Sequence, residues 1–191
     1  ADLRQHRELI AGARVLLLQM EIPRETVFEA LRLGRECGLT TILNPAPAAP
    51  LPSDLLRLVD ILTPNESEAQ VLTGSADPAE AARILTDRGV GTVVVTCGAN
   101  GAFLATGNDV THIPGFLVET IDSTGAGDAF NGALACAVAE GVPLKSAIER
   151  ANAAGALATT GRGAQESMPT KDDIEQLCRS GIRQLEPPPR S

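Results

Sequence analysis

Short apolar runs that alternate with helical patterns constrain the fold of this 191-residue chain more than any other feature. Runs that are apolar throughout are typical of strands buried on both faces of a parallel sheet. Between the first two runs the pattern predicts a helix, so this segment forms one right-handed βαβ unit. The repetition predicts a three-layer α/β domain with a mostly parallel sheet. The runs occupy residues 15–19, 40–43, 60–63 and 92–96.

The rest of the chain continues this pattern. The pair Asn100-Gly101 predicts a hairpin turn between the strand over residues 92–96 and residues 102–105, and a further strand is expected over residues 110–114. His112 in that strand is expected to be an ordinary structural residue. We assign residues 1–180 to one domain and the proline-rich residues 181–191 to a tail. Helices are expected over residues 3–12, 23–38, 77–88, 129–140, 144–160 and 171–178, and from Asn65 onward.

The composition excludes several classes of function. Aromatic residues make up 2% of the chain, which argues against a platform on which the bases of single-stranded nucleic acid stack. The formal net charge is -8, which argues against a broad contact with the phosphate backbone of a nucleic acid. No run is long enough to cross a membrane, and no signal peptide is visible. The four cysteines are scattered along the sequence, so a zinc site is not expected. A reducing, cytoplasmic location is expected instead.

A glycine-rich turn before an apolar helix is the strongest chemical signal. Gly125, Ala126 and Gly127 are small enough to let backbone N–H groups point outward at the positive end of the helix dipole, which makes an anion site. Asp128 follows directly, and a carboxylate beside bound phosphate suits a general base that takes a proton from a hydroxyl. The alternative is that Asp128 only caps the helix.

Three segments carry a resemblance to a known family. The motif Asp-Ser-Thr-Gly-Ala-Gly-Asp over residues 122–128 resembles the signature of the ribokinase-like (PfkB) sugar and nucleoside kinases. Residues 44–48, Asn-Pro-Ala-Pro-Ala, and the Gly-Ala-Gln-x-Ser-x-Pro of residues 163–169 resemble the ribokinase branch of that family. The likeness extends from Leu3 to about Leu177, but it matches only the C-terminal part of such kinases. It implies an α/β/α domain that lacks the N-terminal strands and the lid, and Ala1 is expected to begin a processed, trimmed or incomplete chain.

The resemblance implies ATP-dependent phosphorylation of D-ribose at its 5-hydroxyl, with Asp128 as the base. Glu21 matches the family's sugar ligand, although its position alone favours the alternative that it starts the next helix and interacts with the helix dipole. Glu68 is expected to order Mg²⁺ through water, although Asn65, Glu66 and Glu68 would also suit a capped first turn.

The resemblance also implies sites for the nucleotide and for a monovalent cation. The expected ATP-binding residues are Asn65, Thr96, Cys97, Gly98, Ala99, Asn100, Gly101, Gly127 and Asn152. A mid-helix asparagine such as Asn152 is more often a solvated surface residue. Oxygen atoms of Asp122, Thr124, Ala158, Gly161, Gly163 and Ser167 are expected to hold K⁺, a hard cation.

Other readings of the chain remain open. Another PfkB sugar kinase, such as a fructokinase or a 2-keto-3-deoxygluconate kinase, would share Asp128 and the anion turn, which is the name used for residues 125–127. A non-catalytic nucleotide-binding fragment is the other alternative, because the sugar-binding N-terminal part is expected to be absent. An incomplete parallel sheet would leave an apolar edge uncovered. The full-length protein is expected to be a homodimer that binds D-ribose and ATP, with no nucleic-acid or membrane partner.

Overall fold

The computed structural model describes residues 2–181, which separate into two compact units. The first unit contains residues 2–96 and 103–111, and the second contains residues 97–102 and 112–181. The assignment of residues 1–180 to one domain stays a prediction, and the predicted tail lies outside the described residues except for Gly181.

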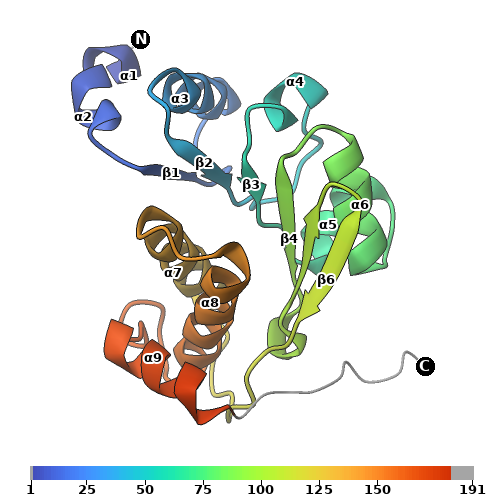
Figure 1. The fold of residues 1–191 in the computed structure, drawn as a ribbon, viewed down its shortest axis with the longest axis vertical. Coiled ribbons are helices and arrows are strands. Elements are labelled where there is room, and N and C mark those ends of the chain that lie inside the picture. The colour runs from blue at the N-terminus through green and yellow to red at the C-terminus, as the bar shows by residue number, and fades with distance from the viewer. Residues whose placement is uncertain (1, 182–191) are drawn as a thin grey trace. The chain divides into compact units, whose positions relative to one another are not determined.

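One six-stranded sheet follows the order of the strands along the chain (Figure 1). The first four strands pair in parallel, with Leu18 opposite Leu43 and Leu43 opposite Leu62. The two-residue connection between the last two strands requires them to run antiparallel, because a parallel pair needs a long crossover. The predicted α/β class and mostly parallel sheet are therefore confirmed. The strands are β1 (Val15–Leu18), β2 (Thr40–Leu43), β3 (Ile61–Leu62), β4 (Thr92–Thr96), β5 (Ala102–Thr106) and β6 (Asp109–Ile113).

The helices of the first unit connect the parallel strands. Because each crossover joins neighbouring strands in the same direction, right-handed connections bring these helices to the same face of the sheet. The helix before β2 buries Val27, Leu31 and Leu33 against β1 and β2, and the last helix of the unit buries Ala81 and Leu85 against β4. The helices are α1 (Asp2–Gln5), α2 (Arg7–Ala11), α3 (Arg24–Glu36), α4 (Ser53–Leu56), α5 (Glu66–Thr73) and α6 (Pro78–Asp87).

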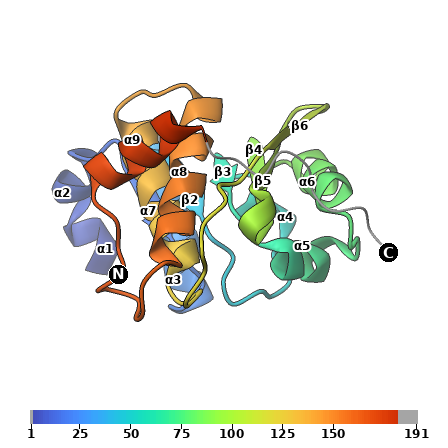
Figure 2. The same ribbon diagram turned by 90° about the horizontal axis from the view of Figure 1, so that it is seen from below.

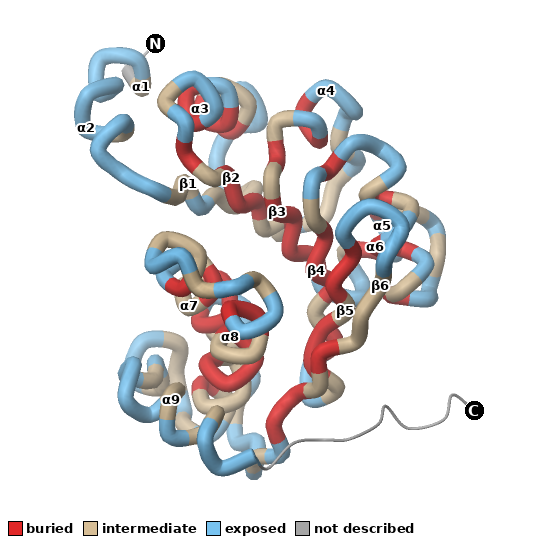
Figure 3. The backbone as a smooth tube through the Cα atoms, in the orientation of Figure 1, coloured by how far each residue is buried: buried red, intermediate tan, exposed pale blue. Residues whose placement is uncertain are grey.

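Three details of the first unit differ from the expectation. The helix expected over residues 3–12 is divided into α1 and α2, because the backbone at His6 is not helical. Strand β1 is not buried on both faces: Leu17 is 36% exposed because β1 is the edge strand of the sheet, whereas Val93, Val94 and Val95 in β4 are fully buried (Figure 3). The tight hairpin turn is also elsewhere. Five residues, with a short 3₁₀ turn, separate β4 from β5, and the two-residue turn joins β5 to β6, where Gly107 has φ 58°.

The second unit is built around three helices that lie side by side (Figures 1 and 2). The first of them begins at Ala126, three residues before the expected start at residue 129, because Ala126 and Gly127 already have helical backbone conformations. Small side chains such as Ala151 and Ala154 allow the first two helices to approach closely, and both residues are buried. The elements are the 3₁₀ turn η1 (Gly98–Asn100), α7 (Ala126–Ala139), α8 (Leu144–Ala158) and α9 (Lys171–Ser180).

Two further sequence expectations concern the described residues as a whole. Over residues 2–181, no helix is both long and apolar enough to cross a membrane. All four cysteines are free thiols in the structure: Cys97 is buried, Cys37 and Cys178 are partly buried, and Cys136 is exposed.

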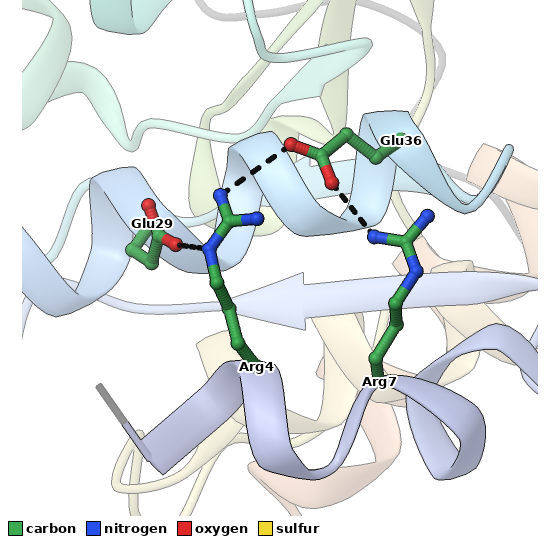
Figure 4. A network of polar contacts seen from close by, with 4 residues as sticks. All are labelled: Arg4, Arg7, Glu29 and Glu36. Atoms are coloured by element: carbon green, nitrogen blue, oxygen red, sulfur yellow. Dashed lines mark hydrogen bonds and ion pairs between the residues drawn. The ribbon is translucent and has the colours of Figure 1, made fainter.

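Ion pairs hold the N-terminal helices against α3 (Figure 4). Arg4 contacts both Glu29 and Glu36, and an Arg7 nitrogen lies 2.7 Å from a carboxylate oxygen of Glu36. Helix α2 has no buried residue, so these exposed contacts are its main attachment. The hydrogen bond from Arg7 lowers the pKa of the Glu36 carboxyl below its ordinary value of 4.5. The stabilisation from this pair is therefore complete above pH 4.5 and is lost as the pH falls through the lowered pKa.

We predict that Glu36→Gln loosens α1 and α2 without changing the stability of the unit. Exposed ion pairs contribute little, so the amides of residues 2–11 should exchange with solvent about two- to fivefold faster, while those of β2 do not change. Hydrogen exchange followed by NMR measures this. Glu8→Gln is the matched control, because Glu8 contributes none of these contacts. Equal exchange rates in the wild type and in Glu36→Gln would contradict the prediction.

Candidate active site

The loops that follow β1 and β2 meet at the carboxyl edge of the sheet, where ligands bind in open α/β folds. The backbone N–H of Met20 donates to the carbonyl of Ala46 at 2.9 Å. Glu21 lies in the first of these loops and is exposed. The side-chain amide of Asn44 donates to the carbonyl of Thr63 at 2.8 Å, which ties the second loop to the end of β3. The predicted location of Glu21 is thus confirmed, while its role as a sugar ligand stays a prediction.

Asn65 and Glu68 form a capping box at the start of α5. The Glu68 backbone N–H donates to Asn65 Oδ1 at 2.8 Å, and the Asn65 N–H donates to Glu68 Oε2 at 2.9 Å. Burial raises the pKa of the Glu68 carboxyl, and the hydrogen bond from the Asn65 backbone partly opposes this shift. Thr96 lies beside this cap, because its N–H donates to the carbonyl of Pro64 at 2.9 Å. The structure therefore brings Asn65, Glu68 and Thr96 together and confirms the capping alternative.

The loop over residues 97–101 is held by backbone contacts that leave no room for a side chain at its end. Gly101 has φ 88°, and a Cβ there would lie 2.2 Å from the carbonyl oxygen of Ile113. His112 Nε2 lies 2.7 Å from the carbonyl oxygen of Asn100, so His112 has the structural role expected for it. Cys97 is buried, but Gly98 and Ala99 are exposed. Their backbone is the part of this loop that a ligand can reach.

Asn152 does not lie on the surface as expected of a mid-helix asparagine. It is 7% exposed, and its side-chain nitrogen donates to the carbonyls of Ile113 and Pro114, each at 3.2 Å. The amide is buried because two carbonyls at the end of β6 need a donor there. Position 152 is one helical turn beyond the buried Ile148, and this spacing is the sequence signal that could have placed it inside. The contacts link Asn152 to the strand that carries His112.

The anion turn is the first turn of α7. Gly125 occupies the N-cap with φ 81°, in the left-handed region, and no side chain caps the helix. The Ala126 N–H donates to the carbonyl of Ser123 at 3.3 Å, and the N–H groups of the next two residues lie where a helix has no intrahelical acceptor. Asp128 is in the first turn rather than at the cap, so the capping alternative is wrong. It is exposed and lines a groove of about 360 Å³ with residues of α7, α8 and α9.

Asp122 joins the anion turn to the loop after α8. Its Oδ1 accepts hydrogen bonds from the Thr124 N–H at 3.0 Å and from the Thr124 hydroxyl at 2.7 Å, and its Oδ2 accepts one from the Gly163 N–H at 3.2 Å. Donation from Thr124 is the main reason why the pKa of the Asp122 carboxyl is lowered. On the other side of the turn, a Cβ on Gly125 would lie 3.1 Å from Cα of Ala164. The two segments are therefore in direct contact.

The six predicted potassium-binding positions lie along these two segments. The carbonyl of Thr159, directly after Ala158, accepts hydrogen bonds from the backbone of residues 121 and 122 at 2.7 and 3.1 Å. The Ser167 hydroxyl donates to the Gly163 carbonyl, and a Cβ on Gly161 would lie 2.9 Å from Cβ of Ser167. Among residues 2–181 there is no group of three His, Cys, Asp or Glu side chains that could hold a metal ion. The six predicted positions therefore offer one carboxylate, that of Asp122, together with carbonyl and hydroxyl oxygens.

Sequence reasoning missed Asn131. It is 4% exposed, and its side-chain nitrogen donates to the carbonyl of Gly127 at 2.9 Å. The available signal was a polar residue inside an otherwise apolar helix, four positions after a glycine of the anion turn.

Comparisons with known proteins show what the chain is similar to. Residues 3–171 match the model of the pfkB family of carbohydrate kinases. The ribokinase of Haemophilus influenzae is 41% identical over 175 residues, which cover 89% of this chain and 57% of that protein. The deoxyribokinase of Salmonella typhi is 35% identical over 182 residues, which cover 92% of this chain and 58% of that protein.

The chain also resembles a solved structure. The ribokinase of Arabidopsis thaliana, complexed with ribose and ATP, superposes with a TM-score of 0.84 at 31% identity, over 92% of this chain and 59% of that one. The chain thus spans about three fifths of the length of these relatives.

We predict that Asn152→Asp destabilises the second unit. The substitution keeps the side-chain shape but turns a buried donor into a charged acceptor that faces two carbonyl oxygens. The free energy of unfolding should fall by about 2–4 kcal/mol at pH 7, as measured by urea denaturation. Asn108→Asp, the same change at an exposed turn residue, should have little effect. A loss no larger than that of this control would contradict the structural role of Asn152.

Proposed function

This chain belongs to the pfkB family of carbohydrate kinases. We propose that it is part of a phosphotransferase that transfers the γ-phosphoryl group of ATP to the 5-hydroxyl of D-ribose. The observation that carries the proposal is the exposed carboxylate of Asp128 in the first turn of α7. A base and a set of backbone N–H donors at one helix end are what transfer to an alcohol requires.

Asp128 acts as the general base. It accepts the proton of the sugar hydroxyl as that oxygen bonds to the γ-phosphorus, and the bond from this phosphorus to the bridging oxygen breaks to release ADP. The backbone N–H groups of the turn from Gly125 to Gly127, at the positive end of α7, offset the charge on the transferring group. Asp122 keeps this turn in place through its hydrogen bonds to Thr124 and Gly163.

The nucleotide is held by residues from two parts of the chain. Gly98 and Ala99 are exposed, and the lack of a side chain at Gly98 allows a ligand to come close to the backbone. Glu21 contacts the sugar at the carboxyl edge of the sheet. The proposed ATP-binding set is Asn65, Thr96, Cys97, Gly98, Ala99, Asn100, Gly101, Gly127 and Asn152.

The residues present fit both proposed cations. Mg²⁺ uses few protein carboxylates and keeps several waters, and Glu68 has one carboxylate oxygen outside its hydrogen bond to Asn65. An ionised carboxylate has about four acceptor positions, of which Asp122 uses three, so it can still accept K⁺ together with the oxygens of Thr124, Ala158, Gly161, Gly163 and Ser167. Bound Mg²⁺ would neutralise charge on the phosphates of ATP.

The proposal includes a homodimeric full-length protein. It also leaves room for sugars related to ribose as acceptors. Since the relatives include a deoxyribokinase, the acceptor panel should contain 2-deoxyribose, fructose and 2-keto-3-deoxygluconate beside ribose. ATP binding without turnover on any of these sugars would favour the alternative of a nucleotide-binding module.

We predict that Asp128→Asn lowers kcat by about 10²–10⁴-fold, because the amide cannot accept the hydroxyl proton. Binding of ATP should change little, since the backbone N–H donors remain. Sugar-dependent ADP release measures the first effect and calorimetric titration with ATP the second. Asp172→Asn removes the same charge from the first turn of α9 and serves as the control. Turnover by Asp128→Asn at the wild-type rate would exclude Asp128 as the base.

We predict that Glu68→Gln raises the Mg²⁺ concentration for half-maximal activity by about 10–100-fold, the usual cost of losing an outer-shell metal contact. Glutamine still completes the capping box, so the stability of α5 should be nearly unchanged. A magnesium titration of the rate at fixed ATP measures the shift, with Glu66→Gln in the same helical turn as the control. An unchanged magnesium requirement would remove Glu68 from the metal site.

A further inference from the structure

Asn131 is a buried amide in the most apolar part of α7. It is 4% exposed and lies next to the buried residues Phe130 and Leu134. Asparagine is a poor helix former, because its side chain competes for backbone hydrogen bonds. Here the side-chain nitrogen donates to the carbonyl of Gly127, one turn earlier, at 2.9 Å. Burying a polar group at this position costs free energy unless the group forms a hydrogen bond. The bond to the Gly127 carbonyl therefore offsets the burial of the amide.

The Gly127 carbonyl belongs to the same peptide group as the Asp128 N–H. In a helix this carbonyl also accepts the backbone N–H of the residue four positions later, which is Asn131 itself. Two donors from one residue therefore fix the plane of the peptide. Because a trans peptide places its N–H opposite its carbonyl, the Asp128 N–H is directed out of the helix N-terminus. The second donor also polarises the peptide and makes this N–H a stronger donor.

The space beside Gly127 is open in the described chain. A Cβ built on Gly127 would meet no heavy atom within 4 Å outside its own helical turn in the described chain. Glycine has the widest range of backbone conformations, and the N-cap Gly125 is a glycine as well. The part of the turn nearest Asp128 thus combines high intrinsic freedom with little packing, and the Asn131 amide supplies a tether.

We propose that Asn131 is a positioning residue that holds the Gly127–Asp128 peptide so that the Asp128 N–H faces the transferring phosphoryl group. The inference deepens the proposed function and rests on it. Asn131 acts through the backbone: one of its side-chain N–H groups donates to the Gly127 carbonyl, and the residue is only 4% exposed.

The test uses a matched pair, Asn131→Thr and Asn131→Val. A threonine hydroxyl in a helix can donate to the carbonyl four residues earlier, and valine has the same shape without this donor. Any cavity left by the asparagine is therefore common to both variants. The kcat of the valine variant should be about 10–100-fold below that of the threonine variant, with similar KM for ATP, because a misdirected oxyanion donor affects the transition state more than the ground state.

A second readout does not depend on turnover. In NMR spectra, titration with inorganic phosphate should shift the amide resonance of Asp128 in the wild type and in Asn131→Thr, and should shift it much less in Asn131→Val. If the valine variant fails to fold, Asn131→Asp replaces it, because aspartate has the shape of asparagine without the N–H donor. Rescue by threonine in both readouts would support the positioning role.

The outcomes separate the two levels of the proposal. A wild type that phosphorylates sugar, with equal kcat and equal amide shifts in the valine and threonine variants, would overturn the role of Asn131 and leave the proposed function standing. A wild type with neither sugar-dependent turnover nor a phosphate-induced shift at Asp128 would overturn both.

Discussion

Buried backbone carbonyls at the ends of helices and strands need hydrogen-bond donors, and much of this structure depends on how that need is met. Three asparagine side chains supply such donors. Asn44 donates to the end of β3, Asn131 to the first turn of α7, and Asn152 to the end of β6. Each of these carbonyls lies at a point where regular structure gives way to a loop with candidate site residues. These side-chain amides therefore hold the backbone next to the loops, while apolar packing holds the helices and strands together.

The regular part of the fold could be predicted from sequence because its causes are local. The apolar runs of β2 and β4 and the capping residues of α5 and α6 depend on residue types within a few positions, and these elements lie where expected. The exposure of Leu17 could not be predicted, because it depends on β1 being at the sheet edge. The burial of Asn152 depends on carbonyls 38 and 39 residues earlier. The start of α7 was missed because glycines do not reveal whether they are helical.

The candidate site also has a part that could be predicted from the sequence and a part that could not. The anion turn and Asp128 stand out in the sequence because a run of small residues before an apolar helix is uncommon. The segments that hold this turn do not stand out, since the bonds from Asp122 to Gly163 and from Asn131 to Gly127 join groups that form no local pattern. Residue type can thus indicate a candidate site, but it does not show which neighbouring residues hold the groups of that site in place.

The contact between the backbones at Gly101 and Gly115 limits how this protein can diverge. A Cβ on Gly115 would lie 2.2 Å from the carbonyl oxygen of Ala99, and a Cβ on Gly101 would lie equally close to that of Ile113. Neither glycine can be exchanged for a larger residue unless the opposing segment moves. Variation in this loop is then left to the exposed positions 98 and 99, which can change in sequence without disturbing the frame that supports them.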